Sequence, residues 1–223
     1  MDFDSFVLAA ATADLAEEPA AREHADAVEF RMDLAADPLD QLADYEGTLP
    51  LLCTNRVEWE GGEAAEGPER LADLELAAEH PRVEAVDVEL DAVVGGDGLS
   101  VVEHAREHGV SVVVSTHDFE GTPPRQELRR LLATAADYGD VAKLAVTATG
   151  LDDALSLLAV TRALAKDDVR VATMAMGAPG SHTRAVAPVY GSRIGYAPVD
   201  PERATAPGQY DLATLRSLVD ALA

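Results

Sequence analysis

The chain of 223 residues has little cysteine, little lysine and few aromatic residues, which make up 4% of it. Because Cys53 is the single cysteine, no intrachain disulfide can form, and we expect a reducing, cytoplasmic setting. No apolar run approaches the roughly 18 residues of a membrane-spanning helix. The first residues, Met1-Asp2-Phe3-Asp4, also lack the cationic start of a signal peptide. These absences predict a protein that does not enter a membrane.

Positive charge is scarce as well. The chain has 17 basic residues against 41 acidic ones, a net charge of −24. The basic residues are scattered rather than clustered, so we expect no nucleic-acid partner. Such acidity resembles that of proteins adapted to concentrated salt, where screening relieves the repulsion between like charges.

Apolar residues make up 48% of the chain, enough for a sizeable core. Strand-like runs alternate with helix-like ones, which favours a parallel sheet with right-handed crossovers. No Gly-x-Gly-x-x-Gly follows the first run, and eight repeats favour a closed barrel over an open sheet. We therefore predict an α/β fold, a (β/α)8 TIM barrel forming one domain over residues 1–223. The predicted strands are Phe6–Ala10, Val28–Met32, Leu49–Thr54, Ala85–Glu89, Val110–Ser115, Val141–Val146, Val171–Met174 and Arg193–Ala197.

Helices are predicted in the gaps between these strands, and Pro and Gly residues mark several of their ends. Their expected ranges are Ala13–His24, Pro38–Tyr45, Pro68–Glu79, Leu99–His108, Pro124–Tyr138, Asp152–Lys166, Ser181–Val189 and Tyr210–Leu222. The acidic segment Glu58–Gly67 is expected to be a long loop, either a mobile flap or a solvated surface loop.

Lys143 lies inside the apolar run Val141–Val146, although the chain contains only one other lysine, Lys166. A lysine side chain is rarely buried unless it pairs with an opposite charge or takes part in the chemistry of a site. Burial favours the neutral amine, which is the form that attacks a carbonyl to make an imine. A side chain that reaches water from a strand end is the alternative.

Charged and polar residues gather at the carboxyl ends of the predicted strands, where barrels place their chemistry. Alternation puts Glu29, Arg31 and Asp33 on one side of the second strand, where they can form an ion-pair ladder. The other residues at these ends are Arg56, Asp87, Glu89, His117, Tyr196 and, in a Gly-rich loop that suits an anion, Arg184. An amine, a proton carrier, carboxylates and arginines at one mouth suit imine chemistry on an anionic carbonyl compound.

Metal ligands are few in the sequence. His104 and His108 are four residues apart on a predicted helix, a spacing that can bind a metal. Without a third ligand nearby in the sequence, we interpret this pair as part of a solvated helix face and predict no metal site.

The ordered motifs resemble those of type I 3-dehydroquinate dehydratases, over nearly the whole chain. The motifs are Glu29-Phe30-Arg31-x-Asp33, Arg56, Glu89, Ser115-Thr116-His117-Asp118-Phe119, Lys143, Met174-x-Met176-Gly177 through Arg184, and Ala206-Pro207-Gly208-Gln209. The resemblance implies a dehydration of 3-dehydroquinate to 3-dehydroshikimate in the shikimate pathway that needs neither metal nor cofactor.

The resemblance also implies roles for individual residues. Lys143 would form the imine, His117 would move the protons, and Glu89 would be the carboxylate beside that histidine. Residues on the substrate would be Glu29, Arg31, Arg56, Arg184, Thr205 and Gln209. Thr205 stands where the family usually has Ser, and we expect its hydroxyl to keep the contact.

Two other classes of protein stay open at this point. One is another lysine-imine barrel, such as an aldolase or transaldolase, which would not need the grip of Arg184 and Gln209 on a carboxylate. The other is a non-catalytic sensing barrel, which could lose Lys143 or His117 without penalty. The sequence also leaves open whether the protein is a homodimer.

Overall fold

The computed structural model describes residues 1–203 and 208–222. Eight parallel strands form the inner wall, in the order β7-β6-β5-β4-β3-β2-β1-β8. The strands are β1 (Val7–Thr12), β2 (Ala27–Arg31), β3 (Leu51–Thr54), β4 (Val83–Glu89), β5 (Ser111–Asp118), β6 (Val141–Thr147), β7 (Val171–Met176) and β8 (Ile194–Pro198). The ring closes where the backbone N–H of Arg193 donates to the carbonyl of Val171 at 2.7 Å, beside a single parallel bridge from Val171 to Ser192. The predicted TIM barrel is confirmed.

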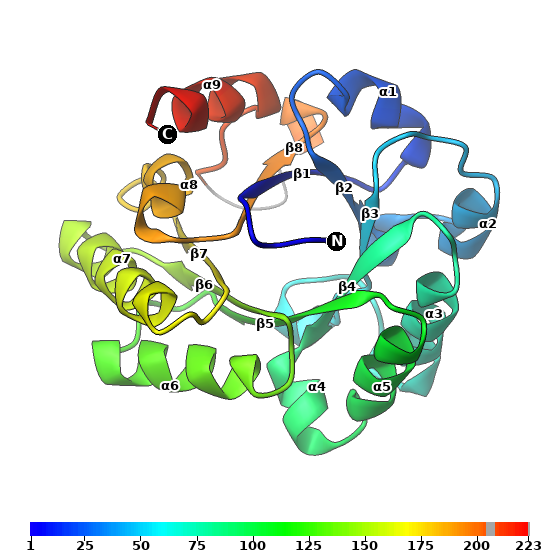
Figure 1. Cartoon of the computed structure of the whole chain (residues 1–223), viewed down its shortest axis with the longest axis horizontal. Coiled ribbons are helices and arrows are strands. Elements are labelled where there is room, and N and C mark those ends of the chain that lie inside the picture. Colours follow the sequence, from blue (N-terminus) through cyan, green and yellow to red (C-terminus); the bar gives the residue numbers. More distant parts are fainter. Residues whose placement is uncertain (204–207, 223) are drawn as a thin grey trace.

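Helices surround this wall on the outside (Figure 1). They are α1 (Glu18–Ala21), α2 (Pro38–Ala43), α3 (Pro68–Ala78), α4 (Leu90–Gly95), α5 (Leu99–Glu107), α6 (Arg125–Ala136), α7 (Leu151–Lys166), α8 (Thr183–Val186) and α9 (Leu212–Leu222). Short 3-10 turns supplement them at Leu15–Glu17, Met32–Leu34, Glu58–Glu60, Ala187–Tyr190 and Pro201–Arg203. No helix of the described residues is long and apolar enough to cross a membrane.

Alternation along each strand divides the core in two. One set of side chains points outward and packs under the helices, as Phe30 and Leu144 do. The other set fills the barrel, where Ala27, Leu52 and Val113 lie in one buried cluster. The inner set changes from apolar to charged toward the carboxyl ends of the strands, so the mouth is the polar end of the barrel.

The opposite end of the barrel is closed by the first residues of the chain, which cross it in an extended conformation (Figure 1). Phe3 is buried among the inward-facing residues of the barrel. The terminal ammonium of Met1 donates to the carbonyl of Glu84, and the Ser111 hydroxyl donates to the carbonyl of Met1. This segment therefore covers the floor of the barrel.

Two predicted helices are shorter in the structure, and one helix was not predicted. For the range Ala13–His24, a 3-10 turn and the short α1 form instead, while the buried carboxylate of Glu18 accepts backbone N–H bonds from Thr48 and Leu49. The range Ser181–Val189 changes to a 3-10 turn at Ala187, because Pro188 has no N–H to donate. The helix α4 follows directly on β4.

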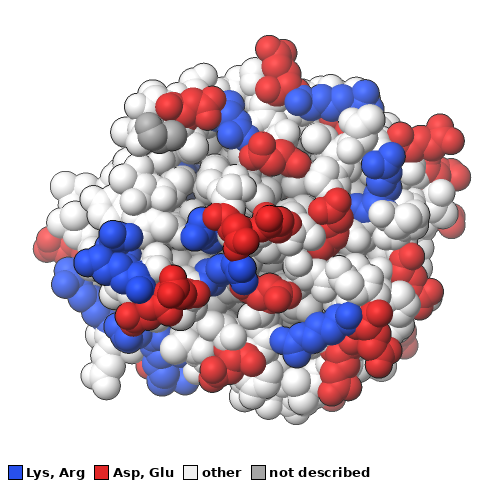
Figure 2. All heavy atoms as spheres, in the orientation of Figure 1, with Lys and Arg blue, Asp and Glu red and all other residues white. Residues whose placement is uncertain are grey.

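Figure 2 shows acidic side chains scattered over the drawn face, with basic side chains among them. With a net charge of −24, we expect the thermal midpoint to rise when salt increases from about 0.01 M to about 1 M. The Debye length falls from roughly 30 Å to roughly 3 Å over this range, so repulsion between surface carboxylates is screened. Melting curves at the two salt concentrations, in the same buffer, measure the effect. An unchanged or lower midpoint in the higher salt would contradict the prediction.

Candidate active site

A cavity opens at the carboxyl ends of the strands. Its lining includes, among others, Glu29, Arg31, Arg56, Glu60, His117, Lys143, Met174, Arg184, Tyr196 and Gln209. The structure therefore brings most of the predicted site residues together. Of the remaining two, Glu89 lies behind the lining and Thr205 falls outside the described residues.

Lys143 lies on β6 with its side chain inside the barrel, and only 4% of the residue is exposed. Its Nζ donates to Oδ2 of Asp87 at 2.8 Å and stands 3.7 Å from Oε1 of Glu29. The same nitrogen lies 4.3 Å from the centre of the Tyr196 ring, on whose face a cation is attracted. These contacts fix the amine below the cavity, so the prediction that Lys143 is a buried lysine is confirmed.

Asp87 is the carboxylate that connects the inner charges, although no individual role for it could be predicted from the sequence. Besides Lys143, its carboxylate accepts from Arg56 Nη2 at 2.6 Å and from the Ser115 hydroxyl at 2.6 Å. Burial opposes its ionisation. The positive charges of Arg56 and Lys143 nevertheless hold the pKa of Asp87 well below its usual range. Asp87 is therefore a permanent anion that keeps Lys143 in place.

His117 lies near the carboxyl end of β5, inside the strand rather than on a loop after it. Its Nδ1 is 2.7 Å from Oε1 of Glu60, so the carboxyl beside the histidine belongs to Glu60 and not to Glu89. Glu89 instead accepts from Arg70 Nη1 at 2.8 Å and from the backbone N–H of Val57 at 3.2 Å. The prediction that placed Glu89 beside His117 is wrong, because Glu60 occupies that position.

Glu60 reaches the cavity because the segment after β3 folds back toward the barrel. Residues Glu58–Glu60 form a 3-10 turn, and Gly61 follows with a φ of 80°, a conformation that favours glycine. At Gly62 a Cβ atom would lie 1.9 Å from the carbonyl oxygen of Arg56, so only glycine fits there. The first part of the predicted loop Glu58–Gly67 is therefore an ordered turn that belongs to the site. In the sequence, the two adjacent glycines after Glu60 indicate this turn.

Burial shifts the pKa values of Glu60 and His117 so that both side chains favour their neutral forms. Burial, together with the nearby Glu89 and Asp87, raises the pKa of Glu60 to about 8. Burial and the positive charges of Arg56 and Lys143 hold the pKa of His117 well below its usual value. Near neutral pH the pair is therefore a protonated carboxyl beside a neutral imidazole, which suits proton transfer.

The raised pKa of Glu60 predicts how stability depends on pH. Between its unfolded value of 4.5 and about 8, the native state holds a proton that the unfolded chain has released. The free energy of unfolding should therefore fall as pH rises through this window. Glu60→Gln removes this titration, so its free energy of unfolding should fall less than that of the wild type. Denaturant unfolding of both proteins between about pH 5 and about pH 8 measures the slopes. Both keep His117, so equal slopes would show that Glu60 does not titrate there.

Arg184 comes from α8, after the Gly-rich loop that follows β7. It is 5% exposed, and its Nε and Nη2 have no hydrogen-bond partner among the described residues. Burial lowers the pKa of Arg184 to about 10, which still leaves it charged at neutral pH. A buried cation without a counterion is costly, so this end of the cavity suits an anionic ligand group.

The predicted ladder on β2 forms only in part. Arg31 donates to both carboxylate oxygens of Asp33, at 2.8 Å and 2.6 Å, in a two-bond pair. Glu29 does not extend this pair, since its Oε1 accepts from the Thr54 hydroxyl at 3.1 Å and approaches Lys143. Asp33 therefore pairs with Arg31, whereas Glu29 lies beside Lys143.

The comparisons with known proteins agree with this geometry. The family model of type I 3-dehydroquinase matches residues 6–223. The chain belongs to this family. A 3-dehydroquinate dehydratase of Haloarcula marismortui is 59% identical over 225 residues, covering 100% of this chain and 98% of that one. Among solved structures, the 3-dehydroquinate dehydratase of Geobacillus kaustophilus has a TM-score of 0.86 at 27% identity, covering 98% and 91% of the two chains. A type I enzyme from Clostridium difficile, solved with covalently modified comenic acid, gives 0.86 at 25% identity, with 98% and 92% covered.

Proposed function

We propose that this chain dehydrates 3-dehydroquinate to 3-dehydroshikimate through a covalent imine on Lys143. Membership of the type I family supports the reaction. The observation that carries the mechanism is a buried lysine that shares one cavity with His117 and with Arg184, whose charge has no counterion among the described residues. An amine, a proton carrier and an anion site are the groups that this dehydration requires.

Each step has a group to perform it. The ammonium of Lys143 passes a proton to His117, and the resulting amine attacks the ketone carbon. His117 returns that proton to the carbinol oxygen, so that water leaves as the protonated C=N bond forms. The protonated imine withdraws electrons from the neighbouring carbon, so His117 can remove a proton there and produce an enamine. The enamine then expels the hydroxyl group, which takes a proton from His117 and leaves as water. Hydrolysis of the imine finally releases the product and restores Lys143.

Other residues in the site position these two groups. Asp87 holds Nζ of Lys143, while Glu60 accepts from Nδ1–H of His117, a tautomer that leaves the lone pair of Nε2 for the substrate. Glu89 neutralises Arg56 and Arg70 behind the cavity, at 3.2 Å and 2.8 Å. We therefore propose Glu89 as a supporting residue and Glu60 as the direct partner of the histidine.

The substrate carboxylate is proposed to bind Arg184 and Gln209, which both line the cavity, while the predicted contact of Thr205 lies outside the described residues. Glu29, Arg31 and Arg56 are proposed to contact the ring hydroxyls, since they line the rest of the cavity. Tyr196 also lines it, and its buried hydroxyl has no hydrogen-bond partner within the described ranges. A substrate hydroxyl would satisfy that group as well.

Removing the guanidinium of Arg184 tests whether this residue binds the substrate carboxylate. We expect Arg184→Ala to weaken substrate binding by about 1.5–3 kcal/mol, the usual size of a lost hydrogen bond to a charged group. Arg184→Lys should restore only part of this, because a point charge cannot make two parallel bonds. Affinity is measured as Kd for the product, or as KM when chemistry is slow. Equal affinity of the wild type and Arg184→Ala would place the carboxylate elsewhere.

The reaction itself is tested by the ultraviolet absorbance of the conjugated product, with 3-dehydroquinate as substrate. No product, together with cleavage of a carbon–carbon bond in an aldol substrate, would favour an aldolase-type barrel. Binding without turnover would favour a sensing barrel.

We further propose a cytoplasmic location, from the single buried Cys53. We also propose a homodimer, which sedimentation in high salt tests.

A further inference from the structure

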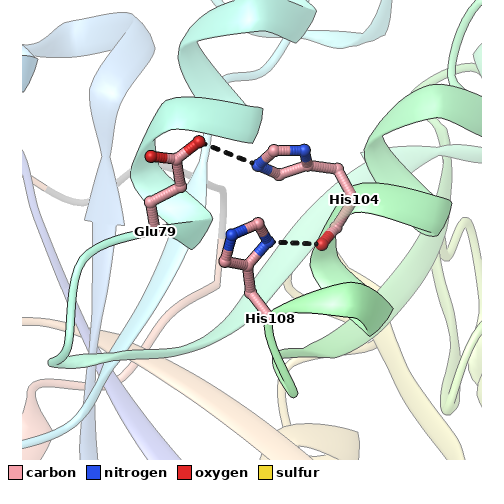
Figure 3. A group of neighbouring side chains, drawn as sticks. All are labelled: Glu79, His104 and His108. Atoms are coloured by element: carbon pink, nitrogen blue, oxygen red, sulfur yellow. Dashed lines mark hydrogen bonds and ion pairs between the residues drawn. The ribbon is translucent and has the colours of Figure 1, made fainter.

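A second cluster of ligand-bearing side chains lies outside the barrel, at the carboxyl ends of α3 and α5 (Figure 3). Glu79 is the C-cap residue of α3, His104 lies in the last turn of α5, and His108 is the C-cap residue of α5. These helices lead into β4 and β5, so the cluster is at the end of the barrel opposite the mouth. Nothing in the proposed dehydration uses it.

The three side chains converge although they are distant in sequence. Nε2 of His104 is 3.2 Å from Oε1 of Glu79, and one ligand atom from each of the three residues lies within 4.8 Å of the others. The two imidazole rings stand 4.4 Å apart between centroids. In the sequence the histidine pair lacked a third ligand, and the packing of α3 against α5 supplies one.

The hydrogen bond of His108 leaves its other nitrogen available. Nδ1 of His108 lies 2.9 Å from the carbonyl oxygen of His104. A carbonyl oxygen only accepts, so in the neutral ring Nδ1 carries the hydrogen and Nε2 has the free lone pair. A backbone carbonyl in this position is the usual partner that orients a metal-ligating histidine.

The spacing of the other two groups fits one ion. In a tetrahedral zinc site with bonds of about 2.0–2.1 Å, two ligand atoms stand about 3.3 Å apart. The distance of 3.2 Å between His104 and Glu79 matches that edge. An ordinary exposed His–Glu ion pair would explain this contact, but it would not explain the second imidazole held against the first with its lone pair free.

We propose that Glu79, His104 and His108 form a binding site for a divalent transition-metal ion, Zn²⁺ above all. Two imidazoles and one carboxylate favour Zn²⁺, Ni²⁺ or Cu²⁺ over Mg²⁺ and Ca²⁺, which prefer oxygen ligands. A solvent molecule would complete the coordination, since all three residues are at least partly exposed. The net charge of −24 favours binding of any cation. The ion would join the ends of α3 and α5 and stabilise the barrel without touching the active site.

Calorimetric titration of chelator-treated protein with ZnCl2 tests this proposal, with MgCl2 as the hard-cation control. We expect one zinc ion per chain and no heat with magnesium. Thermal unfolding at a free zinc concentration of about 100 Kd should show a midpoint roughly 5–10 °C higher than without metal. Turnover should be the same with and without zinc.

Single variants locate the ion. His104→Ala, His108→Ala and Glu79→Gln should each weaken zinc binding at least about tenfold, with circular dichroism confirming that they fold. His24→Ala removes a histidine outside the cluster, and His117→Ala removes the one in the active site. Both should bind zinc as the wild type does. Absence of zinc binding up to millimolar concentrations would overturn the proposal. So would binding that survives His104→Ala and His108→Ala or that disappears in His117→Ala.

Discussion

Lys143→Arg should have no measurable turnover, although it keeps a positive charge beside Asp87. Arginine can still donate to the Asp87 carboxylate, so we expect the variant to fold, but its guanidinium cannot form the imine. In the wild type, borohydride added with substrate or product should reduce the C=N bond to a stable amine. The protein should then gain the mass of the reduced ligand, and Lys143→Arg should gain none.

Peptide mapping makes this experiment specific, because the chain has only two lysines. The adduct should be on the peptide that contains Val141–Val146. Lys166 is exposed at the end of α7, at the opposite end of the barrel from the cavity, and it should stay unmodified. An adduct on Lys166, or full activity in Lys143→Arg, would remove the imine mechanism from this protein.

Loss of the imidazole should have the next largest effect. His117→Ala should lower kcat by about two to four orders of magnitude, the usual contribution of a positioned acid–base group. Glu60→Gln should lower it less, because the amide can still bond Nδ1 and the raised pKa of Glu60 already makes this group neutral near pH 7. Glu89→Gln should act mainly through stability, since Glu89 pairs with Arg56 and Arg70.

The order of these effects separates the two carboxylates. Steady-state rates with saturating substrate give kcat, and denaturant unfolding of the same variants gives their stability. If Glu89→Gln lowered kcat more than Glu60→Gln while both folded equally well, Glu60 would not be the working partner of His117. If Glu60→Gln were worse than His117→Ala, the proton would move through Glu60 itself.

Most of the fold could be predicted from local patterns. Each strand is a short apolar run bounded by turn residues, and the order of strands follows from their alternation with helices. The errors occurred where tertiary contacts outweigh helix propensity. Around α1, which is only Glu18–Ala21, the buried Glu18 carboxylate accepts bonds from two backbone N–H groups of a neighbouring loop.

Which charges pair inside the barrel could not be read from the sequence. Alternation predicts that Asp87 and Glu89 both point inward, but it does not say which cation each one meets. The partners come from neighbouring strands and from the turn after β3, so they depend on how β3, β4 and β6 stagger in the ring. That stagger puts Asp87 against Lys143, and the turn brings Glu60 to His117.

The sequence by itself determined the barrel and the set of chemical groups at its mouth, including the one buried lysine, because both depend on periodicity and on residue types at strand ends. Only the tertiary structure decided that Glu60 serves His117, that Arg184 lacks a counterion among the described residues, and that Glu79 joins His104 and His108. The physical reason is the same for all three. Whether such groups find a partner depends on how segments far apart in the chain pack together, which no local pattern encodes.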